Sequence, residues 1–383
     1  MKILTGLLLS ILVSGLSLLV LSALISTPAG RADWQPANIS GERATWTVGS
    51  AVQHENLTIF PVISDQQSST DEFITLDEGL SSGKVAVTEI GAQSESTPPV
   101  NRQDNVNQAQ RNRINAPNQV QAQIQQRVGS GGQVNRLTVT NNSGKILVLI
   151  AGEIVVGGKQ DRIVANDCII PSTGKAVPID VFCVEHGRWQ QRAAGRDANG
   201  KFVAAEGVMA APKVREKAQA RKDQSSVWNE VSDKVAKNRV STSTGTLNSV
   251  YEDGSVKKKL DAYESALKGR FSSASIVGAV VAVGGKIVTA DVFANSHLFQ
   301  AYWPKLLRSY SLEAISSSET AKQQITAADA QAFLSRVSGK AESKVSDGVY
   351  RLSENQSDSD ASFELEATAS KAKLLHFNRV SKK

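Results

Sequence analysis

The chain has 383 residues, of which 40% are hydrophobic and 21% charged, and its formal net charge is +6. This length and composition are typical of a globular protein with one large domain or two ordinary ones, and they exclude a wholly disordered chain. Because the positive residues are spread along the chain and aromatic residues make up only 5% of it, we expect no nucleic-acid partner.

An almost wholly apolar run lies at residues 3–25, with Lys2 before it and Arg31 after it. The run is long enough to cross a bilayer, and Gly30-Arg31-Ala32 offers a cleavage site. Residues 1–32 therefore fit a signal peptide and an N-terminal membrane anchor about equally well. In either case we expect an exported protein, membrane-anchored or periplasmic or secreted. If the segment is retained, the membrane is a partner through residues 3–25.

Residues 33–53 are predicted to be a linker or an added edge segment before a domain at residues 54–380. Strands are predicted in the first half of this domain, where apolar residues alternate or form short runs. They lie at residues 57–63, 73–80 (a short strand and then a turn of helix), 84–90, 137–140, 146–150, 154–156, 162–164, 169–171 and 177–184. Residues 91–133 are rich in Gln, Asn, Ser and Arg, which predicts a disordered insert between two strands.

The second half of the domain changes to helical spacing. Helices are predicted at residues 227–235, 256–267, 298–310 and 327–337, with Pro304 starting a new turn. A hairpin is predicted at residues 276–293 around Gly284-Gly285, and closing strands at 349–352, 363–367 and 374–380. The predicted fold class is α+β: a single large domain with a β-rich first half, a helical second half and a few closing C-terminal strands.

Cys168 and Cys183 both lie in apolar sequence. They fit one disulfide in an oxidising compartment and two buried free thiols equally well. No CxxC or HxxxH spacing occurs, so we expect no metal site and no cofactor.

Two polar runs interrupt the strand-like sequence. The first, Gly152 to Arg162, contains Gly157-Gly158-Lys159 but differs from a phosphate-binding P-loop, because Glu153 stands where that loop needs glycine and Gln160 where it needs Ser or Thr. Gly157-Gly158 instead predicts a tight hairpin turn with positive φ. On a two-residue turn, Glu153 and Arg162 would face each other across the strands.

The second run is Cys183-Val184-Glu185-His186-Gly187-Arg188-Trp189, the signature run below. Arg162 and Arg188 are candidates for a clamp on a phosphate or carboxylate group, and Glu153 or Glu185 for a general acid or base. The alternative is a structural ion-pair network that locks the hairpin to the strand ending near Trp189. Trp189 is an anchor or a side chain that stacks on a ligand, and His186 is expected to be a solvent-facing histidine.

Both runs resemble the ARG-and-Rhodanese-Phosphatase-superfamily-associated Protein domain family. The similarity continues at residues 57–62, 75–80, 227–231 and 291–303, and covers the chain from about residue 54 to residue 380. The positions that match are Glu153, Gly157, Gly158, Gln160, Arg162, Cys183, Glu185, Gly187, Arg188 and Trp189. The resemblance implies an α+β domain and a link to ADP-ribose or NAD-derived ligands through ADP-ribosylglycohydrolases and rhodanese-like phosphatases.

We therefore expect an exported domain that binds a phosphate- or nucleotide-bearing, ADP-ribose-like ligand. In this hypothesis Arg162 and Arg188 bind the anionic group, Gln160 orients it, Trp189 contacts the ligand, and Gly157, Gly158, Gly187 and Cys183 shape the motif. The alternative is a structural or interaction module of the cell envelope without catalysis. Whether the domain is an enzyme, and its oligomeric state, do not follow from the sequence.

Overall fold

The computed structural model describes residues 45–90, 135–190, 200–318, 324–336, 340–346, 348–368, 370 and 373–383. The apolar run at residues 3–25 and the predicted insert at residues 91–133 lie outside these ranges. Within them, no helix has the length and apolar character needed to cross a membrane.

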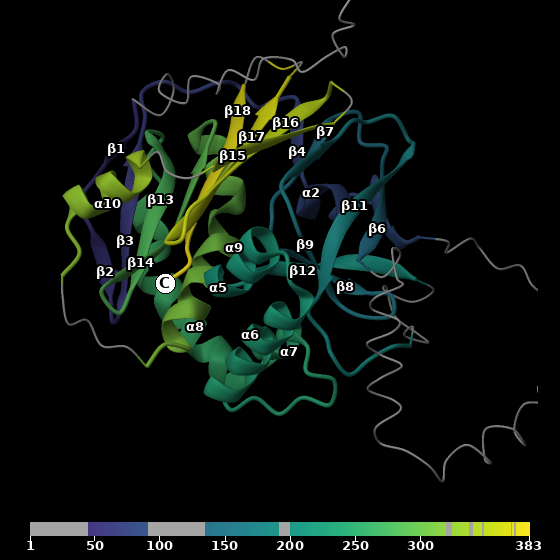
Figure 1. Cartoon of the computed structure of the whole chain (residues 1–383), viewed down its shortest axis with the longest axis horizontal. Helices are drawn as coiled ribbons and strands as arrows, with labels where there is room; N and C mark the ends of the chain where they lie inside the picture. The colour runs from purple at the N-terminus through teal and green to yellow at the C-terminus, as the bar shows by residue number, and fades with distance from the viewer. Residues whose placement is uncertain are drawn as a thin grey trace, which may run out of the picture. The chain divides into compact units, whose positions relative to one another are not determined.

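A closed six-stranded barrel, in the order β11-β6-β5-β12-β8-β9, carries both polar runs (Figure 1). Its strands are β5 (Val85–Glu89), β6 (Arg136–Asn141), β8 (Glu153–Gly157), β9 (Arg162–Val164), β11 (Ala176–Cys183) and β12 (Lys201–Met209). Alternate residues of these strands, including Val87, Val139, Val155 and Val164, pack together in one apolar cluster. The barrel is therefore filled by side chains and is not a channel.

A nine-stranded antiparallel sheet forms the second large element of the fold, in the order β1-β3-β13-β14-β18-β17-β16-β15, with β2 also paired to β3. Its strands are β1 (Thr47–Val48), β2 (Val52–His54), β3 (Leu57–Ile63), β13 (Ile276–Val283), β14 (Lys286–Phe293), β15 (Lys340–Ser346), β16 (Tyr350–Gln356), β17 (Asp360–Ala367) and β18 (Leu374–Ser381). β1 and most of β2 come from the segment expected to be a linker or an added edge segment. The two C-terminal strands β17 and β18 lie inside the sheet, where β18 pairs with β14.

A small three-stranded sheet lies beside the barrel. β4 (Phe73–Thr75) is parallel to β7 (Ile146–Leu149), which is antiparallel to β10 (Cys168–Ile170). The predicted helical turn after β4 is the short helix α2 (Leu76–Ser81), which begins with a capping box between Thr75 and Glu78.

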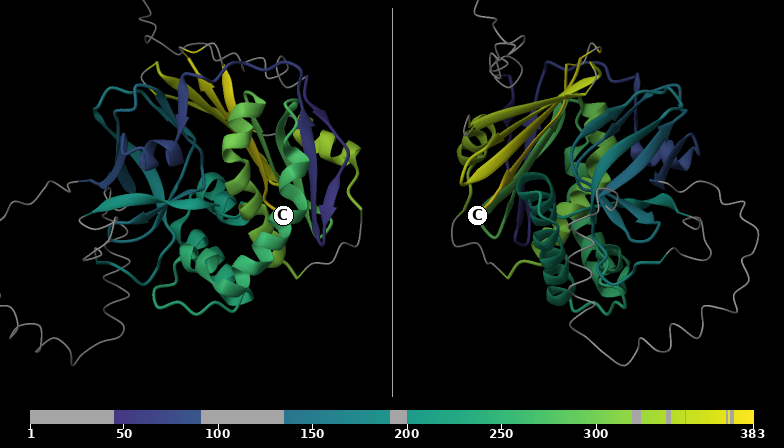
Figure 2. Two further views of the ribbon diagram at one scale, coloured as in Figure 1. Left: turned by 180° about the vertical axis from the view of Figure 1, so that it is seen from behind. Right: turned by 45° about the vertical axis from the view of Figure 1, so that its right-hand side comes forward.

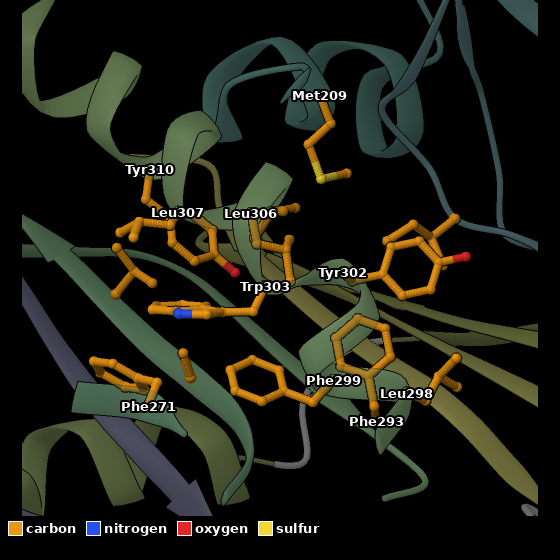
Figure 3. Packing of buried hydrophobic residues seen from close by; sticks show 14 of the residues in the cluster. Met209, Phe271, Phe293, Leu298, Phe299, Tyr302, Trp303, Leu306, Leu307 and Tyr310 are labelled. Atoms are coloured by element: carbon orange, nitrogen blue, oxygen red, sulfur yellow. The ribbon is translucent and has the colours of Figure 1, made fainter. Parts of the chain in front are cut away.

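The remaining helices are α5 (Pro212–Arg215), the π-helix η1 (Glu216–Arg221), α6 (Gln224–Lys237), α7 (Leu247–Glu252), α8 (Gly254–Leu267), the 3₁₀ helix η2 (Lys268–Phe271), α9 (Ser296–Ile315) and α10 (Ala327–Ser335). Helix α9 packs against β12 of the barrel and β13 of the large sheet (Figures 1 and 2). Its apolar stripe, which includes Tyr302, Trp303 and Tyr310, enters the main core, where Trp303 lies 4.5 Å from the Phe271 ring (Figure 3). Helix α9 is therefore the element shared by barrel and sheet.

The α+β fold class is confirmed, with strands first, helices later and closing strands at the end of the chain. Pro304, which was expected to start a new turn, lies inside the continuous helix α9. Strands β12 and β15 were not predicted. Cys168 and Cys183 are both buried and are not joined in a disulfide, which agrees with the second of the two alternatives for the cysteines.

Candidate functional site

The barrel brings the two polar runs side by side. In the register of β11 and β9, Cys183 lies opposite Arg162. The turn between β8 and β9 has positive φ at Gly157 (140°) and Gly158 (49°), as predicted, and a Cβ atom at Gly158 would collide with the ring of Phe202. Glycine is therefore required at position 158 by both the backbone and the packing.

Glu153 and Arg162 do not face each other, contrary to the prediction. The residue opposite Arg162 is Val155. The prediction failed because the connection is the four residues between Gly157 and Arg162 and not a two-residue turn.

Arg188 is the centre of a buried polar network at this end of the barrel. Its Nε donates to both carboxylate oxygens of Glu185 at 2.9 and 3.0 Å, and its Nη2 donates to Glu185 at 2.7 Å and to Asp161 at 3.2 Å. Its Nη1 donates to the carbonyls of Gly158 at 2.6 Å and Gln190 at 3.0 Å. All three guanidinium nitrogens therefore have partners within the chain. These groups are called the Arg188 network below.

Glu185 is held in its ionised form by this network. Burial alone would raise the pKa of Glu185, but hydrogen bonds from Arg188, Thr244 and the Asp161 N–H lower it below its ordinary value. The Asp161 N–H donates to Glu185 at 2.9 Å. A carboxylate that is ionised and already bonded to an arginine is a poor general acid.

The network also fixes the chain before α7. Thr246 donates its hydroxyl to Asp161 at 2.6 Å, and the Gly187 N–H donates to the Thr244 carbonyl at 2.7 Å. A Cβ atom at Gly187 would lie 3.0 Å from the Thr244 Cα atom, so glycine permits this close approach. The signature run thus joins the barrel to the helical part of the domain.

Glu153 belongs to a separate cluster. Its carboxylate accepts from Lys305 of α9 at 2.8 Å and from the Ile150 N–H at 2.9 Å, and Lys305 also pairs with Asp77 at 2.8 Å. Burial raises the pKa of Glu153, and Lys305 opposes this shift only in part. The two candidate acids, Glu153 and Glu185, therefore make no common contact in the described part of the chain.

Arg162 differs from Arg188 in having few partners. Its side chain is buried (3% exposed), and its Nη1 donates a long 3.4 Å bond to the Asp161 carbonyl. Its Nε has no hydrogen-bond partner among the described residues. It forms no ion pair with a carboxylate of the described residues. Burial raises the pKa of the neighbouring Cys183 thiol, although the charge of Arg162 opposes this.

Gln160 and Trp189, the other predicted ligand residues, lie at the same end of the barrel. Gln160 is fully buried; its amide nitrogen donates to the Glu185 carbonyl at 2.7 Å, while its side-chain oxygen has no partner among the described residues. Trp189 is 41% exposed, so its ring is available for contact. The exposed His186 packs its ring edge-on against Trp228.

A second buried network was not predicted from the sequence; it is called the core network below. Arg215 of α5 donates to Asp291 of β14 at 2.6 and 3.1 Å, and the Tyr310 hydroxyl donates to the same carboxylate at 2.6 Å. His376 of β18 lies 2.6 Å from Asp167 and 3.3 Å from Asp291. The core network connects the large sheet to the loop between β9 and β10. Its charged side chains have no exposed surface, so it is sealed from any soluble substrate.

Because of the core network, we expect the free energy of unfolding of the domain to fall at alkaline pH. Burial would lower the pKa of His376, but Asp167 and Asp291 raise it from 6.5 to about 9. Because the pKa of His376 is higher in the folded state than in the unfolded state, protonation of His376 stabilises the fold. This contribution is complete below pH 6.5 and is lost as the pH rises through about 9. We expect urea unfolding between pH 6 and pH 10 to show a loss of about 3 kcal/mol from this group.

His376→Gln is the control for this alkaline loss, because other groups also titrate above pH 8. The glutamine variant should be less stable at pH 6 and should show a shallower dependence on pH. An identical dependence in both proteins would contradict the role of His376.

Within the described residues, no group of three or more His, Cys, Asp or Glu side chains is arranged to hold a metal ion. Comparison with curated proteins gives no match, and comparison with solved structures gives none either. The model of one family, described as the ARG and Rhodanese-Phosphatase-superfamily-associated Protein domain, matches residues 45–380. Since this match covers nearly the whole chain, including both polar runs and all the sheets, the protein belongs to the ARG and Rhodanese-Phosphatase-superfamily-associated Protein domain family.

Proposed function

We propose that this domain binds a small anionic ligand through a phosphate or carboxylate group, and that Arg162 is the residue that contacts the anion. The observation that carries the proposal is the buried guanidinium of Arg162, whose Nε has no partner and which forms no ion pair among the described residues. A buried charge without a partner is unfavourable. An anion bound beside Arg162 would accept hydrogen bonds from the guanidinium and neutralise its charge, which would remove the penalty. The planar guanidinium suits phosphate and carboxylate geometry.

The other residues of the two runs have supporting roles in this proposal. The unpartnered side-chain oxygen of Gln160 is an acceptor for an N–H or O–H group of the ligand. The exposed ring of Trp189 is available to stack on a planar or apolar part of it. We assign Arg188 and Glu185 to the framework that positions these groups, because their charged atoms are already bonded to each other.

The family name motivates nucleotides that contain ADP-ribose as the first ligands to test. The apolar run at residues 3–25 supports export, and so we propose that the ligand is met outside the cytoplasm. Free phosphate and carboxylate compounds therefore belong in the same panel as nucleotides.

The experiment is isothermal titration of the purified full chain with inorganic phosphate, ADP-ribose and NAD. We expect at least one of them to bind, and the Arg162→Met variant to bind it at least about tenfold more weakly, as expected when a charged hydrogen bond is lost. Arg136→Met is the matched control, because Arg136 is half-exposed and pairs with Asp180 on the barrel surface; its affinity should be unchanged. If none of the three compounds binds at millimolar concentration, the proposal is wrong.

Arg162→Met also has a predicted effect on stability. Replacing a buried charge that has no ion pair among the described residues with an apolar side chain of similar length should leave the melting temperature unchanged or raise it. Differential scanning calorimetry of the wild type and the variant, both without ligand, measures this. A fall of several degrees would show that Arg162 stabilises the fold through contacts of its own.

A structural or interaction module without catalysis is the second candidate function. The observation that favours it is the engagement of every guanidinium nitrogen of Arg188 within the chain. Under this alternative, Arg162→Met would lose stability and the full chain would bind no small anion.

A further inference from the structure

A polar pocket of about 380 Å³ lies beside the Arg188 network, outside the barrel. Its walls include Glu185, Arg188, Thr242, Thr244, Ser249 and Glu252. The volume falls at the small end of the range for ligand pockets, about 300–1,000 Å³. The residues proposed to contact the anion, Arg162, Gln160 and Trp189, are not among these wall residues, although Glu185 and Arg188 of the supporting framework are.

The walls of the pocket are fixed before any ligand arrives. The Leu247 N–H donates to the Val184 carbonyl at 3.0 Å, and the Gly187 N–H donates to the Thr244 carbonyl at 2.7 Å. The Thr242 hydroxyl accepts from the Gly245 N–H at 3.1 Å. The segment at residues 241–249 is thus held on the signature run by two backbone hydrogen bonds and braced by one of its own. A pre-organised wall lowers the entropic penalty of binding.

The charges around the pocket disfavour an anion. Glu185 and Glu252 contribute two carboxylates to the wall, and Arg188 contributes one guanidinium, whose nitrogens are already bonded within the chain. Among the described wall residues, a phosphate or carboxylate group would therefore meet net negative charge and no cationic group other than Arg188. The pocket thus differs in charge from the position of Arg162.

The hydrogen-bonding groups of the pocket instead suit a ligand rich in hydroxyl groups. The hydroxyls of Thr242 and Ser249 lie 3.3 Å apart and both donate and accept. The Glu252 carboxylate accepts from the Asn248 amide at 2.8 Å through one of its two oxygens, which leaves the other oxygen as an acceptor. The pocket residues are all polar or charged, so a mainly apolar ligand would leave them without partners.

We propose that this pocket binds a neutral polyhydroxylated compound, a sugar or a polyol. Hydroxyl groups of the ligand donate to Glu252 and exchange hydrogen bonds with Thr242 and Ser249. The inference concerns a site separate from Arg162, so it stands or falls independently of the proposed anion binding.

Saturation-transfer difference NMR on the full chain tests the proposal with a panel of glycerol, ribose, glucose and inositol. We expect at least one polyol to give a signal, and Glu252→Ala and Ser249→Ala each to weaken its binding by about tenfold. Ser265→Ala is the matched control, because Ser265 lies on α8, outside the walls given for this pocket, and its hydroxyl donates to the carbonyl of Asp261. The signal of this variant should equal that of the wild type.

Two variants are used because Ser249 and Glu252 are separate residues of the pocket wall. Circular dichroism establishes that each variant is folded. The proposal is overturned if no polyol gives a signal with the wild type. It is also overturned if the signal persists unchanged in both folded variants, or if the same two variants abolish binding of inorganic phosphate, since the pocket would then be an anion site.

Discussion

Asp291→Asn is expected to lower the free energy of unfolding by about 3–5 kcal/mol, because breaking a buried ion pair leaves its partner charged and uncompensated. Asp291 has no exposed surface and contacts Arg215 through two hydrogen bonds, Tyr310 through a third and Asn378 through a fourth. Arg215 and His376 lower the pKa of Asp291 well below its ordinary value against the effect of burial. The asparagine keeps the shape of the side chain but places an NH₂ group and no negative charge against the guanidinium.

Urea unfolding at pH 7 measures this loss, and soluble yield should fall with it. Asp261→Asn is the control. Asp261 also pairs with an arginine, Arg308, at 2.8 Å, but its side chain is 58% exposed, so we expect a change of less than about 1 kcal/mol. If the two substitutions had similar effects, the core network would not be a principal source of stability.

Arg188→Ala is expected to produce the second large loss, about 3 kcal/mol or more, because it removes the partner of two buried carboxylates. Glu185 and Asp161 would keep their charges in a region where their side chains are almost fully buried. The carbonyls of Gly157 and Gly158 would also lose the donors that hold the β8–β9 turn. For a domain of this size the melting temperature should fall by several degrees.

Calorimetry of Arg188→Ala beside Arg136→Ala measures this effect. Arg136 pairs with Asp180 at 3.2 Å, but both side chains are about half exposed, so its removal should change stability by less than about 1 kcal/mol. If Arg188→Ala melted like the wild type but no longer bound an anion, Arg188 would be a ligand-binding residue and not a structural one.

Most of the fold was predictable because its strands and helices show their own periodicity. The hairpin of β13 and β14 follows from two apolar runs around Gly284-Gly285, and α8 from Val256, Leu260, Tyr263 and Leu267 at helical spacing. Strand β12 was missed because Lys201, Glu206 and Gly207 interrupt its apolar pattern. Such local patterns indicate secondary structure. They do not show that the strands close into a barrel, because closure depends on contacts between distant segments.

The sequence brought Arg162 and Cys183 into one candidate site, and the structure places them opposite each other. It also grouped Glu153 with Glu185, which the structure separates, because the partner of Glu153 is Lys305 on a helix 152 residues later in the chain. The core network could not be predicted for the same reason: Asp167 and His376 are 209 residues apart and meet only in the folded domain. Two of its members gave a local signal: Asp291 lies between buried Ala290 and Val292, and His376 lies between buried Leu375 and Phe377 in a strand.

The proposed anion site depends most directly on what contacts the Arg162 guanidinium. A high-resolution crystal structure of the full chain, grown in the presence of inorganic phosphate, tests it at the atom concerned. We predict an anion about 2.7–3.0 Å from the Arg162 Nε atom, the distance of a charge-assisted hydrogen bond, with the Arg188 network unchanged. If Arg162 Nε were instead bonded to a carboxylate of the protein or to a water molecule, with no phosphate bound near it, the proposed binding site would be contradicted.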